Sequence, residues 1–416
     1  MLNRTIYELT GRFSGMKGLH LLLIGCLAAL LVAAACTTTQ QATADVGILY
    51  TKGTGPMPTL LATKQIDGYI AWQPFVEVAP VAHIGKVITY SGELPPDDRW
   101  KNHPCCVLTA RTDMLAANPE LVNDLSAVTI LSTRYITDHP SEAADIVADW
   151  LAGKGNFTYG NVSVSSVDVL DRAFPTVKFV NEPSEQWMAG QVEFVYALRE
   201  LGTISGKLKN TTDDQTRSIL FDTGPYNAAE AMINAKSFKV PNPTSAPVGV
   251  GYLLSDHHAS LFVAVKKWQY FNDTYGIALK PEDPTASKPD LVDLLIGGQK
   301  VATLKLIPAD AGPQLMQLAA TNTIQIAYVG NPPAISAIDQ GTPVKILMAL
   351  NDEGSGVVVV TESPATDWPS FVQWAKDRAA AGKPIKMAAP GKGSIQDVML
   401  RYALEESGLS VKEVQT

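Results

Sequence analysis

Short apolar runs alternate with segments of helical period over most of this 416-residue chain. The runs Val248–Leu253 and Val357–Val360 have the length and the branched side chains of buried strands. Between such runs, apolar residues recur at the three-to-four-residue spacing of an amphipathic helix. Further strands are expected at 69–72, 87–90 and 385–389, and helices at 261–271, 368–381 and 395–409. Alternation of this kind predicts an α/β fold with parallel sheets.

Residues 1–36 have the features of an export signal. A basic start and an apolar run lead to the small residues Ala33–Ala35 and then to Cys36. This arrangement resembles a lipoprotein signal, in which the cysteine is lipidated and becomes the new N-terminus. A plain membrane anchor is the alternative, although the apolar run is shorter than the about 20 residues that a spanning helix needs. Residues 37–45 are small and polar and form a tether, so we expect an extracytoplasmic protein held at the membrane through Cys36.

Composition excludes several classes of function. Apolar residues make up 46% and charged residues 18%, which is typical of a globular chain, and about 370 residues after the tether suffice for two domains. A net charge of −8 without a basic block argues against a nucleic-acid partner. Beyond Cys36 only Cys105 and Cys106 remain, so the chain has no disulfide framework.

A family resemblance is carried by residues in the second half of the chain. Tyr252-Leu253, Asp256-His257, Ala259 and Phe262, followed by Tyr270-Phe271 and Tyr275-Gly276-Ile277, resemble the start of mature solute-binding proteins of the nitrate/sulfonate/taurine ABC-transporter family. Matches at 326–331, 354–356 and 391–394 follow in family order. The segment Gln65–Phe75, which should come next in that family, comes first here. The resemblance therefore covers nearly everything after the tether in a circularly permuted order.

The resemblance implies a periplasmic-binding-protein-like (type II) fold of two α/β lobes with a ligand cleft between them. Residues 46–103 plus 357–416 would form the smaller lobe and 104–356 the larger one. Two explanations of the order stay open: a true permutation, or a fragment of a tandem or misassembled gene. A true permutation predicts that Thr416 ends close to Asp45 and that the strand 46–50 pairs near 385–389 and 69–72.

Three strand-to-helix turns are candidate ligand-binding sites, because helix N-termini attract anions. They are Lys392-Gly393-Ser394, Thr54-Gly55 and Gly330-Asn331. Glycine admits close approach of a ligand, Ser394 caps a helix or binds an oxyanion, and Lys392 adds charge. Ordinary capped turns are the alternative in each case.

Four more residues are expected at the cleft. Trp72 and Gln73 end a buried strand, where a ring can wall a ligand and an amide can bond it. Ser355 lies in a loop that lines the family's cleft, unless its two glycines serve only as a hinge. His257 is expected to make a cleft hydrogen bond. No metal is expected, because adjacent histidines without a carboxylate spacing match no metal motif. Cys105 and Cys106 form either a strained bridge or, more simply, two buried thiols.

The resemblance implies a binding protein that is not an enzyme. It would act as a monomer without a cofactor, close around a small organic or inorganic anion such as sulfonate or nitrate, and present it to the permease subunits of an ABC importer. The alternative is a thiamin-pyrimidine-precursor-binding or synthase-like protein, because pyrimidine synthases look like the same fold and carry a histidine with a cysteine-rich run. His257 with Cys105-Cys106 is similar to that pair of features.

Overall fold

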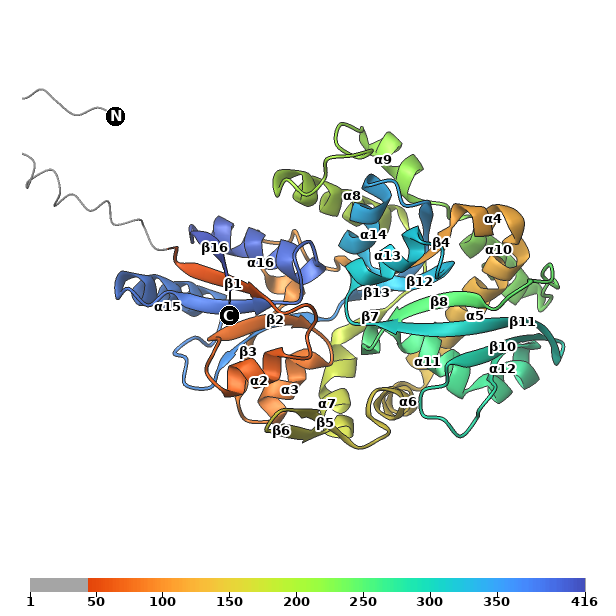
Figure 1. The fold of residues 1–416 in the computed structure, drawn as a ribbon, viewed down its shortest axis with the longest axis horizontal. Helices are drawn as coiled ribbons and strands as arrows, with labels where there is room; N and C mark the ends of the chain where they lie inside the picture. Colours follow the sequence, from red (N-terminus) through yellow and green to blue (C-terminus); the bar gives the residue numbers. More distant parts are fainter. Residues whose placement is uncertain (1–43, 416) are drawn as a thin grey trace, which may run out of the picture. The chain divides into compact units, whose positions relative to one another are not determined.

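Two large β-sheets organise residues 44–415, the part of the chain that the computed structural model describes (Figure 1). The expected signal with Cys36 and residues 37–43 of the tether lie outside the described residues. Among the residues described, none of the helices combines the length and the apolarity needed to cross a membrane.

The smaller sheet joins the first part of the described chain to the last. Its six strands follow the order β16-β1-β15-β2-β14-β3. They are β1 (Val46–Tyr50), β2 (Gly68–Trp72), β3 (Gly85–Tyr90), β14 (Ser355–Val360), β15 (Ile385–Ala389) and β16 (Val411–Val414). The first four strands in the sheet order are parallel, and β14 is antiparallel to both of its neighbours.

The helices of this lobe include two whose first turn is capped by a side chain. The helices are α2 (Met57–Ala62), α3 (Phe75–Val81), η1 (Ser91–Glu93), α15 (Trp368–Ala380) and α16 (Ile395–Glu406). Asp367 accepts a hydrogen bond from the Ser370 N–H at the start of α15, and Ser394 accepts one from the Asp397 N–H at the start of α16. Such caps satisfy backbone donors that the helix itself leaves free.

The larger sheet has eight strands in the order β7-β13-β4-β12-β8-β11-β10-β9. They are β4 (Pro104–Arg111), β7 (Val177–Phe179), β8 (Val248–Leu253), β9 (Ile277–Pro281), β10 (Leu291–Ile296), β11 (Gln299–Ala309), β12 (Ile326–Gly330) and β13 (Val344–Glu353). A separate hairpin pairs β5 (Asn156–Tyr159) with β6 (Val162–Ser165).

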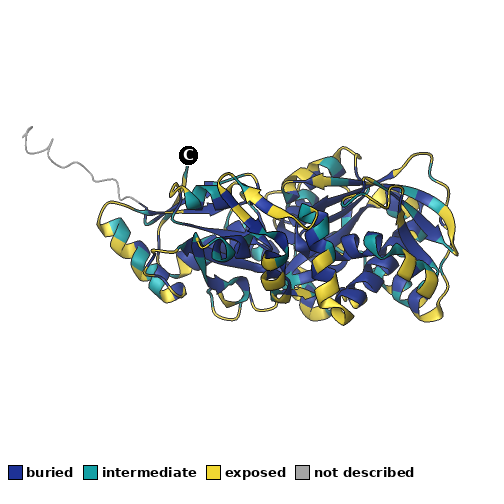
Figure 2. Ribbon diagram, turned by 90° about the horizontal axis from the view of Figure 1, so that it is seen from below, coloured by how far each residue is buried: buried dark blue, intermediate teal, exposed yellow. Residues whose placement is uncertain are grey.

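Helices surround the larger sheet. They are α4 (Thr112–Ala117), α5 (Pro119–Asp138), α6 (Pro140–Ala152), α7 (Ser166–Ala173), η2 (Phe174–Thr176), α8 (Glu185–Glu200), α9 (Asp213–Leu220), α10 (Gly224–Ala235), η3 (Asp256–His258), α11 (Ala259–Lys266), α12 (Trp268–Tyr275), α13 (Gly312–Ala320) and α14 (Asn331–Asp339). Figure 2 shows mostly buried strands in both sheets and exposed residues on outer helices and loops.

The chain crosses between the two sheets twice, over residues 91–103 and at Gly354. A strand that the chain enters from the other sheet has no crossover helix to its new neighbours, so it need not lie parallel to them. Accordingly β4 and β14 are antiparallel to their neighbours, and both sheets are mixed rather than purely parallel. The division expected at 103/104 falls between β3 and β4. The one expected at 356/357 falls inside β14, so that Ser355 and Gly356 belong to the six-stranded sheet.

The last described strand of the chain lies next to the first one. β16 lies parallel to β1, with Val411 opposite Val46 and Val414 opposite Leu49. Ser410 and Asp45 are hydrogen-bonded, which leaves the end of β16 roughly 13 Å further along the strand direction. Thr416 lies outside the described residues, so the expected approach of the chain's end to Asp45 stays a prediction. β1 pairs with β15 as expected, but β15 separates it from β2.

Candidate functional site

A small cavity lies where strands of the two sheets end. Trp72, Leu253 and Gly330 are the last residues of β2, β8 and β12, and all three line it. The carboxyl ends of strands are the usual position of ligand crevices in α/β folds. The cavity measures about 30 Å³, which is room for about one water molecule. Its other lining residues are Cys105, Cys106, Ser255, His257, His258, Gly312, Pro333, Ser394, Ile395 and Gln396. We call it the inner cavity.

Three helix N-termini converge on the inner cavity. Gly312 is the first residue of α13, Gly330 caps α14 and Ser394 caps α16. The N-terminus of a helix carries a partial positive charge that favours an anionic group. At α16 this charge is already met, because Asp397 accepts hydrogen bonds from the Gly393 N–H and from the Tyr50 hydroxyl. Helices α13 and α14 have no acidic residue in their first turns.

Asn331 is a fully buried amide without a partner. It directly follows Gly330, and neither its Nδ2 nor its Oδ1 has a hydrogen-bond partner among the residues that the structure describes. An unsatisfied buried polar group costs about 1–3 kcal/mol. The neighbouring Gly330 lines the inner cavity, whereas Asn331 is not among the described lining residues.

A larger cavity of about 600 Å³ lies next to the inner one, and Trp72 lines both. Thr54 and Gly55, expected at the site, line this outer cavity. The remaining lining residues are Lys52, Gly53, Pro56, Phe75, Leu151, Ala152, Asn156, Phe157, Thr158, Tyr159, Leu254, Ala309 and Asp310. Aromatic rings dominate one wall: Trp72 meets Phe75 edge to face at 6.4 Å between centroids, and Phe75 lies 6.0 Å from Tyr159. Such a wall suits the apolar body of an organic ligand.

Hydrogen bonds hold the two lobes together around these cavities. Gln73 Nε2 donates to Thr176 Oγ1, and the Ser255 hydroxyl donates to the Gln73 carbonyl. Gln73 Oε1 is buried without a partner in the described part of the chain. Ser355, expected in a cleft loop, is instead a buried strand residue whose Oγ accepts from Gln396 Nε2. Gln73 therefore lies at the lobe interface, and neither Gln73 nor Ser355 is among the described residues that line the two cavities.

Lys392 and Gly393 line a different groove of about 400 Å³, between the start of α16 and helices α13 and α14. The Lys392 ammonium is 2.5 Å from a Glu413 carboxylate oxygen, and its side chain is 60% exposed. No lysine or arginine is among the described residues that line the inner cavity. The charge that we expected Lys392 to supply to a cleft anion is thus directed elsewhere in this conformation.

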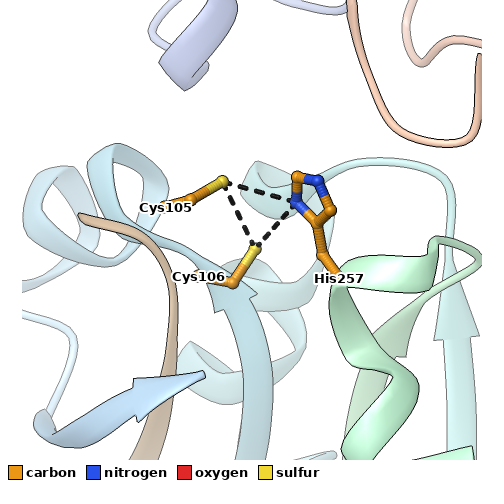
Figure 3. Close-up of side chains that lie close together, drawn as sticks. All are labelled: Cys105, Cys106 and His257. Carbon is orange, nitrogen blue, oxygen red and sulfur yellow. Dashed lines mark hydrogen bonds between the residues drawn. The ribbon is translucent and has the colours of Figure 1, made fainter. Parts of the chain in front are cut away.

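Cys105, Cys106 and His257 form a compact cluster on the wall of the inner cavity (Figure 3). His257 Nδ1 is 3.4 Å from Cys105 Sγ and 3.7 Å from Cys106 Sγ. The two sulfurs are 4.0 Å apart, so both cysteines are free buried thiols and not a bridge, which needs about 2.05 Å. His257 Nε2 is 2.8 Å from the Gly354 carbonyl, which can only accept, so this nitrogen carries the proton.

Burial keeps the neighbouring groups neutral. It raises the pKa of the Cys105 thiol well above its usual value. Burial also lowers the pKa of His258 to about 3. Nδ1 of His258 accepts a hydrogen bond from the Leu253 N–H, so its Nε2 carries a proton that has no acceptor in the described structure. The site thus offers one more free donor beside Asn331.

Sequence reasoning missed several residues that line these cavities. Ser255 lies two residues after the end of β8, and its position near a strand end was a usable signal. Gln396 lies in the first turn of α16, two residues after the predicted cap Ser394. Phe157 and Tyr159 belong to the hairpin β5–β6, for which the sequence indicated no candidate residue.

Two α/β lobes with a cavity at their strand ends define a periplasmic-binding-protein-like fold. The chain belongs to the NMT1-like family, which it matches over residues 25–152 and 241–416. It is also 38% identical over 117 residues to the uncharacterized protein MJ1180 of Methanocaldococcus jannaschii, covering 27% of this chain and 78% of that protein. No solved structure matches the chain significantly. Residues 153–240, which include the hairpin of the outer cavity's wall, lie outside the family match.

Proposed function

We propose that this protein is a solute-binding protein that captures a small organic anion between its lobes. The carrying observation is the convergence of three helix N-termini on one interlobe cavity, together with the unpartnered amide of Asn331, which directly follows the lining residue Gly330. Closure would bring the lobe of 46–103 and 357–416 against that of 104–356, with the solute's binding energy stabilising the closed state.

The two cavities suggest a solute with two parts. The anionic head, a sulfonate or a carboxylate, would occupy the inner cavity, which must widen beyond 30 Å³ to admit it. The body would lie in the outer cavity against Trp72 and Phe75. An inorganic ion such as nitrate would leave most of the 600 Å³ unused, so we favour an organic anion.

A calorimetric titration series tests this preference. Aromatic sulfonates and carboxylates should bind more tightly than nitrate or sulfate, and they should change the tryptophan fluorescence. A Trp72→Leu variant should lose that fluorescence change, whereas Trp374→Leu, on helix α15, should keep it. Equal binding of inorganic and organic anions, or a signal that persists without Trp72, would remove the outer cavity from the site.

The family and the N-terminal sequence support an importer role. We propose that the protein is extracytoplasmic, lipidated at Cys36, monomeric and recognised by ABC permease subunits. A Cys36→Ser variant should appear in the soluble fraction after cell lysis, whereas the parent should sediment with membranes. An unchanged distribution would contradict lipid anchoring.

A second candidate is an enzyme similar to the pyrimidine synthases of thiamin biosynthesis. The observation that favours it is the meeting of His257 with both cysteines. Mass spectrometry of a bound solute over time separates the candidates, since a binding protein releases its solute chemically unchanged.

We also propose that the chain order is permuted relative to the family. Both chain halves contribute strands to the six-stranded sheet, which supports one folded molecule. A rearranged chain that joins 416 to 45 should fold only with a linker long enough to return along β1. Folding with a direct junction would contradict the parallel arrangement of β16 and β1.

A further inference from the structure

The cluster of Cys105, Cys106 and His257 has the dimensions of a metal site. Zinc–sulfur bonds of about 2.3 Å and zinc–nitrogen bonds of about 2.0–2.1 Å, set at tetrahedral angles, place two sulfurs about 3.8 Å apart and sulfur and nitrogen about 3.6 Å apart. The observed separations are 4.0 Å between sulfurs and 3.4 and 3.7 Å between sulfur and nitrogen. The three donor atoms thus already stand where a tetrahedral cation needs them.

The imidazole is oriented as a metal ligand. Its Nε2–H donates to the Gly354 carbonyl, which leaves the lone pair of Nδ1 facing both sulfurs (Figure 3). A backbone acceptor on the far nitrogen is the usual support of a ligating histidine.

Rigid elements hold the ligands. Both cysteines lie on β4, which is flanked by β12 and β13 within the larger sheet. His257 lies in the short helix η3, whose first donor is capped by Ser255. The ligands Cys106 and His257 are 151 residues apart in the chain, so no short sequence motif could indicate the site. This explains why the sequence predicted no metal.

We propose that Cys105, Cys106 and His257 bind one thiophilic d¹⁰ cation, Zn²⁺, through two thiolates and one imidazole. Thiolate and imidazole ligands select zinc over the hard ions Mg²⁺ and Ca²⁺. The described group contains only these three ligands, so a fourth position stays open toward the inner cavity. Three protein ligands and one open position are typical of zinc sites that accept an outside ligand. The proposal does not depend on the identity, or the existence, of a transported solute.

Cobalt substitution tests the site directly. The full-length protein, purified with reductant and stripped with a chelator, is titrated with Co²⁺ and then with Zn²⁺. One equivalent of Co²⁺ should give intense visible bands of tetrahedral geometry and a thiolate charge-transfer band, and one equivalent of Zn²⁺ should abolish both. Cys105→Ser, Cys106→Ser and His257→Gln should each weaken Zn²⁺ binding by more than the about 10–100-fold typical of a lost supporting contact. His103→Gln, which alters a buried histidine beside β4 outside the cluster, should bind normally.

A second measurement uses only the wild-type protein, so the proposal can still be tested if the variants do not fold. Zn²⁺ should protect Cys105 and Cys106 of the wild-type protein from alkylation, as mapped on peptides so that Cys26 and Cys36 are counted separately. Absence of tetrahedral cobalt bands together with unprotected thiols would overturn the proposal. So would a Cys105–Cys106 disulfide that forms under reducing conditions. Stoichiometric iron that is bound by the same residues would overturn the choice of cation.

Discussion

Gly354 is the residue at which the chain passes from one sheet to the other, and no other residue type fits there. Its φ is +83°, in the left-handed region, and a Cβ at this position would clash with His257 Nε2. Its carbonyl accepts hydrogen bonds from the Gln73 N–H and from His257. Gly354→Ala should therefore lower the free energy of unfolding by more than the about 1–3 kcal/mol of backbone strain alone.

Urea unfolding measures this loss, and the chain offers a matched control. Gly276 has a similar φ of +76°, but a Cβ there meets nothing within 4 Å. Gly276→Ala should show the strain without the clash. Equal losses of unfolding free energy in the two variants would mean that the His257 side chain moves aside easily. The packing around Gly354 would then be looser than described.

The Asn331 side chain should lower the stability of the ligand-free protein and strengthen its binding of an organic anion. Asn331→Leu removes an unpartnered buried amide, so the ligand-free protein should become more stable by about 1–3 kcal/mol. The same variant should bind an organic anion about 10–100-fold more weakly, because one charge-assisted hydrogen bond is lost. Thermal unfolding and calorimetry on one preparation give both numbers. Asn331→Asp, of equal size, should repel the anion, and unimpaired binding in that variant would place the head group elsewhere.

At the scale of elements, helix α5 carries a buried acid that sets a pH dependence. Burial, with a contribution from the charge of Glu120, raises the pKa of Asp124 from about 3.8 to about 8. Between these values the unfolded chain releases this proton while the folded chain keeps it. The contribution of Asp124 to the free energy of unfolding should therefore be largest near pH 4 and fall as the pH rises toward 8, by at most about 5 kcal/mol.

Asp124→Asn should remove this fall, because the amide stays neutral at every pH. Urea unfolding at pH 4, 6 and 8 compares the two proteins, and Asp138→Asn, at the exposed end of the same helix, is the control. A variant that keeps the wild-type slope would show that Asp124 ionises freely in the folded protein.

Strands were predicted better than helix ends and edge elements. The runs 248–253 and 385–389 coincide with β8 and β15, because β8 is buried at every residue and β15 at every residue but Lys386, as expected for strands covered on both faces. The helix expected over 261–271 is divided at Lys267 into α11 and α12, and the one expected to reach Leu409 ends at Glu406. The short β16 and the hairpin β5–β6 carry few buried residues and gave little signal.

At the scale of the whole molecule, the sequence indicated the fold class but not how the site is assembled. The two-lobed α/β fold followed from the alternation of elements and from the family resemblance. The meeting of Cys105 and Cys106 with His257, and the turn of Lys392 toward Glu413, depend on contacts between distant segments that no local pattern encodes. Residues at strand ends, such as Trp72, could be placed because topology alone positions them.

Native mass spectrometry of protein purified without unfolding tests the central claim most directly. We predict that the wild-type chain retains one small organic anion, or gains one from a panel of sulfonates and carboxylates. The Asn331→Leu variant, prepared in parallel, should retain none. A wild-type protein that carries no ligand and takes up none of the panel, or a variant that keeps the same ligand equally well, would contradict solute binding between the lobes.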